Sequence, residues 1–237
     1  MYLNKSPLIT TVIVTYNCGE IIREAIESIL NQSYKNIEIV VVDGNSDDLT
    51  QRVLSDYKHK IQVFVSEPDK GVYDAMNKAL KLAHGDFLIF LGADDHFISN
   101  NILENVVKFM KGPNVVYYGD VYRNTRNDIY KGKFVKYKLA CENICHQSIF
   151  YPKAIYKNYE YDLSFPVLAD HVYNIRLWDK IEFVYMPVCI SYYNCLGLSS
   201  QHEKADRYSK MLFAEIKEHL GYFYFLVRHI YLFIKSL

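Results

Sequence analysis

The stretch SEPDKGVYDAMNKALKLAHGDFLIFLGADD, residues 66–95, contains the elements around which we expect the fold to be built. From Val72 to Ala83, apolar residues recur at steps of three and four, which predicts a helix with one buried face. The next run, FLIFL at 87–91, is continuously apolar, as is typical of a parallel strand covered on both faces. Two adjacent carboxylates, Asp94 and Asp95, follow that strand.

The paired carboxylates indicate a bound cation. Two ionised carboxylates at a crowded strand end repel each other, so we expect a counter-charge beside them. Divalent cations prefer oxygen ligands, and open α/β sheets bind ligands beyond the carboxyl ends of their strands. The stretch therefore predicts a metal-bound phosphate ligand at the end of this strand.

The same strand–helix alternation extends to both sides of the stretch. Further strands are expected at 8–14, 37–42, 61–65 and 115–118, with helical patterns between them. Such alternation predicts an α/β fold with a parallel sheet and crossover helices. Neither G-x-G-x-x-G nor a Walker lysine motif occurs, which disfavours dinucleotide binding and P-loop chemistry. We therefore expect a Rossmann-like, nucleotide-binding layer of a different type.

The rhythm changes after Gly119. Residues 120–138 are polar, basic and tyrosine-rich, which predicts a hairpin or a pair of edge strands. Further elements are expected at 144–151, 168–178 and 183–193. No linker and no repeat interrupts the chain, so we predict one domain over 1–200, with its two halves at 1–118 and 119–200.

The tail, residues 203–237, is expected to form two helices. Its second part, 221–237, is apolar nearly all round but has Arg228 at its middle. At about 1.5 Å per residue this part is about 25 Å long, which is short for a membrane span. We favour a helix in a membrane interface, and packing on the domain or in a homodimer is the alternative. Since no secretory leader is visible, we expect a cytoplasmic protein attached peripherally to the inner face of the membrane.

Composition narrows the classes of function. The 27 basic and 27 acidic residues cancel, which argues against a general nucleic-acid binder. The 22 tyrosines and 13 phenylalanines suit a sugar-stacking surface or a membrane interface, and a tyrosine-rich core is equally compatible with them. Five irregularly spaced cysteines fit a reducing compartment.

Short motifs stand in order along the first hundred residues. They are VIVTYN at 12–17, SILNQSY at 28–34, VDGNSDD at 42–48, Gly71 with Asn77, AHGD at 83–86 and GADD at 92–95. Together they resemble the signature of family 2 glycosyltransferases, and the resemblance covers at least residues 8–180. It implies a GT-A fold and an inverting transfer of a sugar from a nucleotide diphosphate to an acceptor hydroxyl. It also implies a nucleotide-sugar-binding half at 1–118 and an acceptor half at 119–200.

The form SEPDKGVYDAMN at 66–77 resembles the branch that builds bacterial surface polysaccharides, such as O-antigen and colanic-acid transferases. The resemblance therefore implies a nucleotide-sugar donor and a lipid-linked saccharide acceptor. A sugar nucleotidyltransferase and a non-catalytic, membrane-bound nucleotide-sugar-binding subunit are the alternatives.

The resemblance also assigns residues on the donor side. Asp95 is expected to bind Mg²⁺ or Mn²⁺ directly, with Asp94 reaching the ribose or a metal-bound water. Asp43 is expected to accept a hydrogen bond from the nucleobase, flanked by Thr15 and Tyr16, and a helix-capping or turn aspartate is the alternative.

Three further donor-side residues follow from the same motifs. Lys70 is expected near the pyrophosphate, although an exposed loop lysine is the alternative. Gly71 and Asn77 are expected to bind the donor. A late histidine, His202, is a further candidate ligand of the metal or the diphosphate.

On the acceptor side, LADH at 168–171 leads into IRL at 175–177, as the family's catalytic helix does. Asp170 is therefore the expected base, which takes the acceptor proton as the hydroxyl attacks. A plain helix cap is the alternative role for this aspartate. His146 and Gln147 resemble the family's His-Gln pair on the acceptor side, and a buried strand histidine is the alternative for His146.

Overall fold

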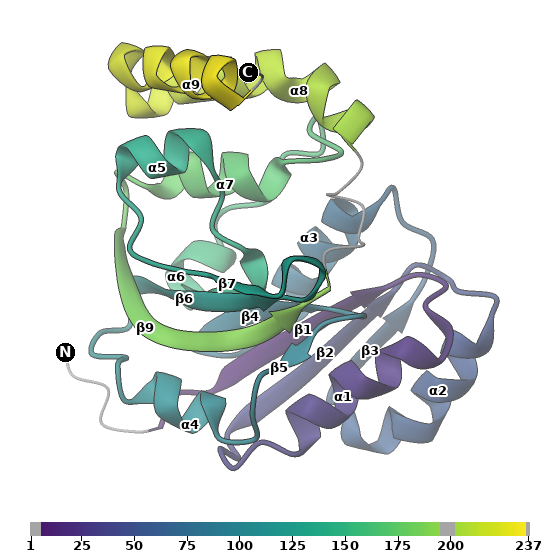
Figure 1. Ribbon diagram of the computed structural model, residues 1–237. Coiled ribbons are helices and arrows are strands. Elements are labelled where there is room, and N and C mark those ends of the chain that lie inside the picture. The colour runs from purple at the N-terminus through teal and green to yellow at the C-terminus, as the bar shows by residue number, and fades with distance from the viewer. Residues whose placement is uncertain (1–5, 195–201, 236–237) are drawn as a thin grey trace.

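A computed structural model of the protein describes residues 6–194 and 202–235, with the side chains of 202–207 and 209 left out of that description. The chain folds as the predicted α/β protein (Figure 1). One curled sheet runs through it in the strand order β3-β2-β1-β4-β8-β6-β9-β5, and β7 pairs with β6 at its side.

The first four of these strands form the parallel part of the sheet. They are β1 (Ile9–Thr15), β2 (Ile37–Asp43), β3 (Val63–Ser66) and β4 (Phe87–Gly92). In the central strands β1 and β4 the apolar side chains are buried on both faces or nearly so, as their continuous apolar runs predict. All four strands end at the same edge, which brings the residues that follow them together.

Helices cover both faces of this parallel part. One apolar core packs α1 (Ile22–Leu30), α2 (Leu49–Tyr57) and α4 (Ile102–Val107) against the first face. A second core packs α3 (Val72–Leu82) against the opposite face. The helix predicted from the spacing of apolar residues in the opening stretch is thus confirmed.

The remaining strands extend the sheet beyond β4. They are β5 (His96–Phe97), β6 (Val115–Arg123), β7 (Asp128–Tyr130), β8 (Ile149–Pro152) and β9 (Glu182–Tyr193). The predicted hairpin is formed by β6 and β7. Strand β6 is longer than its apolar run, because its outer half is held by pairing with β9.

The second half of the chain adds short helices, and two longer ones follow them. These are α5 (Lys136–Cys141), α6 (Lys153–Tyr156), α7 (Ala169–Leu177), α8 (His202–Glu215), a π-helical turn η6 (Ile216–Leu220) and α9 (Tyr222–Lys235). Single 3-10 turns lie at η1 (Gly19–Ile21), η2 (Lys58–Lys60), η3 (Asn124–Arg126) and η4 (His146–Ser148).

The two tail helices pack on α5 and α7 (Figure 1). Arg176 of α7 donates two hydrogen bonds to the Glu215 carboxylate of α8, from Nε and Nη2, both at 2.7 Å. Arg228 of α9 is buried, and its Nη1 donates to the carbonyl of Ala140 at the end of α5, at 2.6 Å. Polar contacts thus attach the tail to α5 and α7.

The outer face of α9 is apolar and exposed. Its exposed side chains are Tyr222, Phe223, Leu226, Ile230, Phe233 and Ile234. In residues 6–194 and 202–235 no helix combines the length and the apolarity needed to cross a membrane.

The contact between Arg176 and Glu215 predicts a measurable loss of stability. We expect Arg176→Ala to lower the free energy of unfolding by about 1–3 kcal/mol, because the mostly buried Glu215 carboxylate loses two charge-assisted hydrogen bonds. Urea unfolding followed by circular dichroism measures this change.

Two further variants serve as controls for this measurement. Arg176→Lys keeps the charge but not the paired geometry, so its loss should be intermediate. Lys136→Ala breaks an ion pair with the exposed Asp179 and should cost less than about 0.5 kcal/mol. Equal losses for Arg176→Ala and Lys136→Ala would contradict this role of Arg176.

Candidate active site

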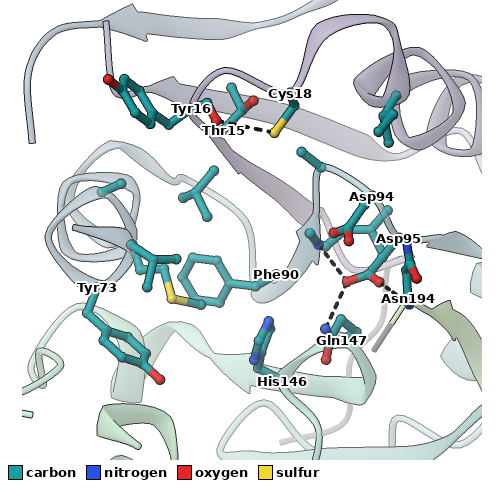
Figure 2. A pocket seen from close by; sticks show the side chains of 18 of the residues that line it. Thr15, Tyr16, Cys18, Tyr73, Phe90, Asp94, Asp95, His146, Gln147 and Asn194 are labelled. Atoms are coloured by element: carbon teal, nitrogen blue, oxygen red, sulfur yellow. Dashed lines mark hydrogen bonds between the residues drawn. The ribbon is translucent and has the colours of Figure 1, made fainter. Parts of the chain in front are cut away.

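A pocket of about 600 Å³ opens at the carboxyl edge of the parallel strands (Figure 2). It is lined by the ends of β1 and β4, the start of α3, the turn η4 and the end of β9. The lining residues lie at 14–18, 21, 69, 71–73, 75–76, 90–95, 146–147 and 193–194. The sheet therefore collects residues from five separate parts of the chain around one cavity.

Asp95 is the most deeply held acid of this pocket, with 2% of its surface exposed. Its Oδ1 accepts a hydrogen bond from the backbone N–H of Asn194 at 2.8 Å. Its Oδ2 accepts from Nε2 of Gln147 at 2.8 Å and from the backbone N–H of Gly92 at 3.2 Å (Figure 2). Burial, with a smaller contribution from the adjacent Asp94 carboxylate, raises the pKa of Asp95 to about 6.

The two acids fit a divalent cation. Burial also raises the pKa of Asp94, and neither Asp94 nor Asp95 forms an ion pair with a described residue. A cation beside them would offset both negative charges. The described residues contain no cluster of three or more histidine, cysteine, aspartate or glutamate side chains at metal-binding distance. A cation held by this pair would therefore take its other ligands from water or a bound phosphate, as Mg²⁺ and Mn²⁺ commonly do.

The predicted contribution of His202 lies outside this description. His202 is the first residue of α8, but its side chain is not among the described ones. Its contact with the metal or the diphosphate stays a prediction.

Asp170, the predicted base, lies on the acceptor side, behind two residues that line the pocket. Its Oδ1 accepts from the Tyr73 hydroxyl at 2.9 Å, and its Oδ2 lies 3.4 Å from Nδ1 of His146. Burial opposes ionisation of this carboxyl, but the contacts with His146 and Tyr73 outweigh it and lower its pKa. The residue at the N-cap of α7 is Leu168, which makes no side-chain hydrogen bond there, so Asp170 does not have the alternative role of a plain cap.

A second group of residues, which no sequence motif marks, orients the Asp170 carboxylate. Nδ2 of Asn143 donates to Asp170 Oδ2 at 2.8 Å. Oδ1 of Asn143 accepts from Nδ2 of Asn174 at 3.0 Å, and Oδ1 of Asn174 accepts from the Tyr151 hydroxyl at 2.7 Å. Because each amide is oriented by the next, Asn143 has to present its N–H to the carboxylate.

Besides Asp94 and Asp95, three of the predicted donor-side residues line the pocket. Thr15 ends β1, Tyr16 follows it, and Gly71 precedes α3 with a φ of 116°, which favours glycine. Lys70 is exposed and lies outside the pocket lining, as the alternative of an ordinary loop lysine describes.

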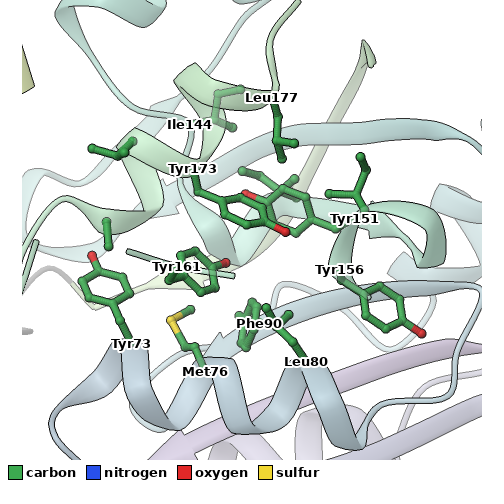
Figure 3. Close-up of a cluster of buried hydrophobic side chains, with 14 of the residues drawn as sticks. Tyr73, Met76, Leu80, Phe90, Ile144, Tyr151, Tyr156, Tyr161, Tyr173 and Leu177 are labelled. Carbon is green, nitrogen blue, oxygen red and sulfur yellow. The ribbon is translucent and has the colours of Figure 1, made fainter. Parts of the chain in front are cut away.

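Asn77 does not line the pocket; its side chain holds a distant loop in place. It is buried on α3, where its Nδ2 donates to the carbonyl of Tyr161 at 2.9 Å. Its Oδ1 accepts from the backbone N–H of Tyr161 at 2.7 Å. The amide thus pairs with the backbone of a distant loop, beside a cluster of buried tyrosines (Figure 3), and is not free to bind a donor.

Asp43 is also withdrawn from the pocket. Its side chain is fully buried and accepts four hydrogen bonds. The donors are the hydroxyl and backbone N–H of Ser46 at 2.5 and 3.1 Å, Nε2 of Gln51 at 2.5 Å, and the hydroxyl of Ser66 at 2.6 Å. Because the turn after β2 folds over this carboxylate, Asp43 does not make the expected direct contact with a nucleobase from this position.

Comparisons with known proteins agree on one family. The family model described as glycosyl transferase family 2 matches residues 10–178. A glycosyltransferase of PGL/p-HBAD biosynthesis from Mycobacterium bovis is 34% identical over 201 residues, covering 81% of this chain and 78% of the relative. The UDP-Glc:alpha-D-GlcNAc-diphosphoundecaprenol beta-1,3-glucosyltransferase WfaP from Escherichia coli is 30% identical over 182 residues, covering 73% of this chain and 70% of the relative.

Solved structures share the fold at low sequence identity. S. aureus TarS 1–349 in complex with UDP matches with a TM-score of 0.69 at 18% identity, covering 89% of this chain and 66% of that one. A longer TarS chain matches over the same 89% of this chain, which is only 40% of the TarS chain. The mannosyltransferase PcManGT from Pyrobaculum calidifontis, in complex with GDP-Man and Mn²⁺, matches with a TM-score of 0.67 at 19% identity, covering 98% and 76%. These likenesses confirm the predicted GT-A fold.

The burial of Asp95 predicts a pH-dependent response to metal. Because its pKa in the folded chain, about 6, lies above the ordinary value of 3.8, its ionisation costs folding free energy. The stability of the metal-free protein should therefore fall as pH rises from about 4 to about 6, and added Mn²⁺ should restore it above pH 6. Calorimetric melting at several pH values, in EDTA and in Mn²⁺, measures both effects.

Asp95→Asn is the control for this experiment, because it removes the titrating group. Its melting temperature should respond to Mn²⁺ much less than that of the wild type. If Mn²⁺ stabilises the wild type equally at pH 5 and pH 7.5, protonation of Asp95 does not compete with the metal.

Proposed function

The chain belongs to glycosyltransferase family 2, and we propose that it is an inverting, metal-dependent enzyme that transfers a sugar from a nucleotide-diphosphate sugar to an acceptor hydroxyl. One observation carries this proposal. Asp94 and the buried Asp95 line the pocket on one side, and His146, which lines it on another, contacts Asp170 behind it at 3.4 Å.

The acidic pair serves the departing diphosphate in this proposal. Mg²⁺ or Mn²⁺ held by Asp95 and Asp94 would neutralise charge on the leaving nucleoside diphosphate. Gln147 and the backbone of Asn194 fix the Asp95 carboxylate for this task. The presence of Mn²⁺ in the PcManGT complex supports this choice of ion.

Asp170 serves the acceptor in this proposal. Its lowered pKa keeps it ionised at neutral pH, so it can receive the proton of the acceptor hydroxyl. As that proton leaves, the acceptor oxygen attacks the anomeric carbon from the face opposite the diphosphate, and the configuration at that carbon inverts. His146 and Gln147 line the pocket beside this point and are proposed to contact the acceptor.

The relatives suggest the class of substrates. The E. coli relatives WfaP and WfgD are named for transfer of glucose from UDP-Glc to a GlcNAc-diphosphoundecaprenol. By analogy we propose a hexose or N-acetylhexosamine donor and a lipid-linked saccharide acceptor, in the synthesis of a bacterial surface polysaccharide such as O-antigen.

We further propose that α9 lies on the inner face of the membrane. Its inner side is tied to α5 by Arg228, which leaves the outer apolar row from Phe223 to Ile234 to meet lipid. The lysines Lys217 and Lys235 near its two ends suit a surface of anionic headgroups. This position would keep the enzyme close to a lipid-linked acceptor.

The transfer reaction is tested by product analysis with UDP-glucose, UDP-GlcNAc and GDP-mannose and a GlcNAc-diphospho-lipid acceptor. We expect release of a nucleoside diphosphate that stops in EDTA, and no turnover in Asp95→Ala. In Asp170→Asn we expect kcat to fall by about a hundredfold or more with an unchanged KM for the donor, because only the base is lost.

Asp179→Asn, an exposed variant just beyond the end of α7, should keep normal turnover. Near-normal turnover of Asp170→Asn would show that this aspartate is not the base. Release of pyrophosphate would instead indicate a nucleotidyltransferase, and donor binding without turnover would indicate a non-catalytic subunit.

Attachment through α9 is tested by co-sedimentation with vesicles of phosphatidylglycerol and phosphatidylethanolamine. We expect the double variant Ile230→Glu/Phe233→Glu to lose most of its binding, since both side chains are more than half exposed on the apolar row. Ile129→Glu, on the exposed edge of β7, should bind as the wild type does. The membrane proposal would be disproved if the wild type does not bind vesicles and instead forms a dimer in sedimentation velocity that the double variant does not form.

A further inference from the structure

Three loops meet at the end of the pocket farthest from β4. Tyr16 follows β1, Gly44 follows β2, and Asp69 lies in the loop after β3. A Cβ atom on Gly44 would lie 2.6 Å from Oδ2 of Asp69 and 3.2 Å from Cδ2 of Tyr16. The Asp69 carboxylate thus occupies the space where any other residue at position 44 would place its side chain.

Asp69 is held so that one of its oxygens is available. Its Oδ1 accepts from the backbone N–H of Gly71 at 2.8 Å, which fixes the side chain. Its Oδ2 accepts no hydrogen bond from the residues that the structure describes. Asp69 lines the pocket, whereas Asp43, the carboxylate nearest to it on β2, is buried under four donors. Asp69 is therefore the acid that this end of the pocket presents to a ligand.

The position of Asp69 along the sheet edge identifies the part of the ligand that it meets. The strand order is β3-β2-β1-β4, so the ends of β3 and β4 are three strand spacings, about 14 Å, apart. With the diphosphate beside Asp94 and Asp95 after β4, the other end of an extended nucleoside diphosphate reaches the loop of Asp69. That end is the nucleobase.

Tyr16 supports the same assignment. Its side chain is 63% exposed although it lines the pocket, so its ring offers an open face beside Asp69. Aromatic rings bind the faces of nucleobases by stacking. A stacked base has its edge free for a hydrogen bond in its own plane, and a fixed carboxylate accepts such a bond only from an N–H group.

We propose that Asp69 determines the nucleobase specificity of the donor. Its Oδ2 accepts the ring N–H of a uracil or a guanine that stacks on Tyr16, and Gly44 leaves the room that the carboxylate needs. Cytosine and adenine present an unprotonated ring nitrogen at the corresponding position, whose lone pair the carboxylate repels. This inference rests on the proposed function, since it takes the ligand to be a nucleotide-sugar donor.

Isothermal titration of UDP, GDP, CDP and ADP in Mn²⁺ tests the proposal. The wild type should bind UDP or GDP more tightly than CDP and ADP. Asp69→Asn should weaken that binding by about tenfold to a hundredfold, the range for a hydrogen bond to a charged group. The variant should also prefer UDP or GDP over CDP less strongly than the wild type does. The asparagine amide can donate to the unprotonated ring nitrogen of cytosine, which the carboxylate repels.

Gly44→Ala tests whether the Asp69 carboxylate needs the space beside Gly44, without changing its charge. It keeps Asp69 but pushes its carboxylate aside, so it should weaken UDP or GDP binding as Asp69→Asn does. If Gly44→Ala does not fold, as circular dichroism will tell, Asp69→Asn decides alone, because asparagine fills the same volume. Asp47→Asn, which removes an exposed carboxylate from the same turn, should bind as the wild type does.

The outcomes separate this inference from the function on which it rests. If the wild type binds UDP or GDP and both variants keep that affinity, or if the wild type prefers CDP or ADP, Asp69 does not read the base and the transferase function stands. If none of the four nucleotides binds the wild type, the proposed function fails and the inference fails with it.

Discussion

The constraint on which the site depends is the burial of Asp95 at the end of β4. A carboxylate with almost no exposed surface is stable only if it is hydrogen-bonded, and two of its three donors come from distant places in the chain. Gln147 comes from the turn before β8, and the backbone of Asn194 comes from the end of β9. The hydrogen bonds to this one acid therefore hold the second half of the chain against the end of the parallel strands.

Asp170, which lies behind the pocket lining, is likewise held by hydrogen bonds from distant parts of the chain. Its carboxylate is bound by Tyr73 from α3 and by Asn143 from the segment after α5, and the amide of Asn143 is in turn oriented by Asn174. Arg228 of α9 binds the carbonyl of Ala140, three residues before Asn143. In our proposal this makes the tail more than an anchor, because α9 packs on the segment that positions the base.

At the end of the pocket near Tyr16, the absence of a side chain at Gly44 decides the roles of the neighbouring aspartates. With glycine at position 44, the Asp69 carboxylate can enter the space beside Tyr16, while Asp43 folds inward and holds the turn that contains Gly44. Asp43 and Asp69, which both stand at or after the end of a strand, thus have opposite surroundings. Asp43 is fully satisfied by the protein, and Asp69 keeps one oxygen for a ligand in our proposal.

The sequence by itself determined the elements and the edge of the sheet where the site lies. Apolar runs and three- and four-residue spacing are local signals, so β1, β2, β4 and α3 could be predicted within a residue or two. The acids after β4 and the family motifs then placed the cleft, because all parallel strands end at one edge. Only the tertiary structure decided which polar residues face that cleft. Asn77 was expected to bind the donor but pairs with the backbone of Tyr161, and Asn143 carried no motif yet contacts Asp170. The direction of a polar side chain depends on partners dozens of residues away, and no local pattern records those partners.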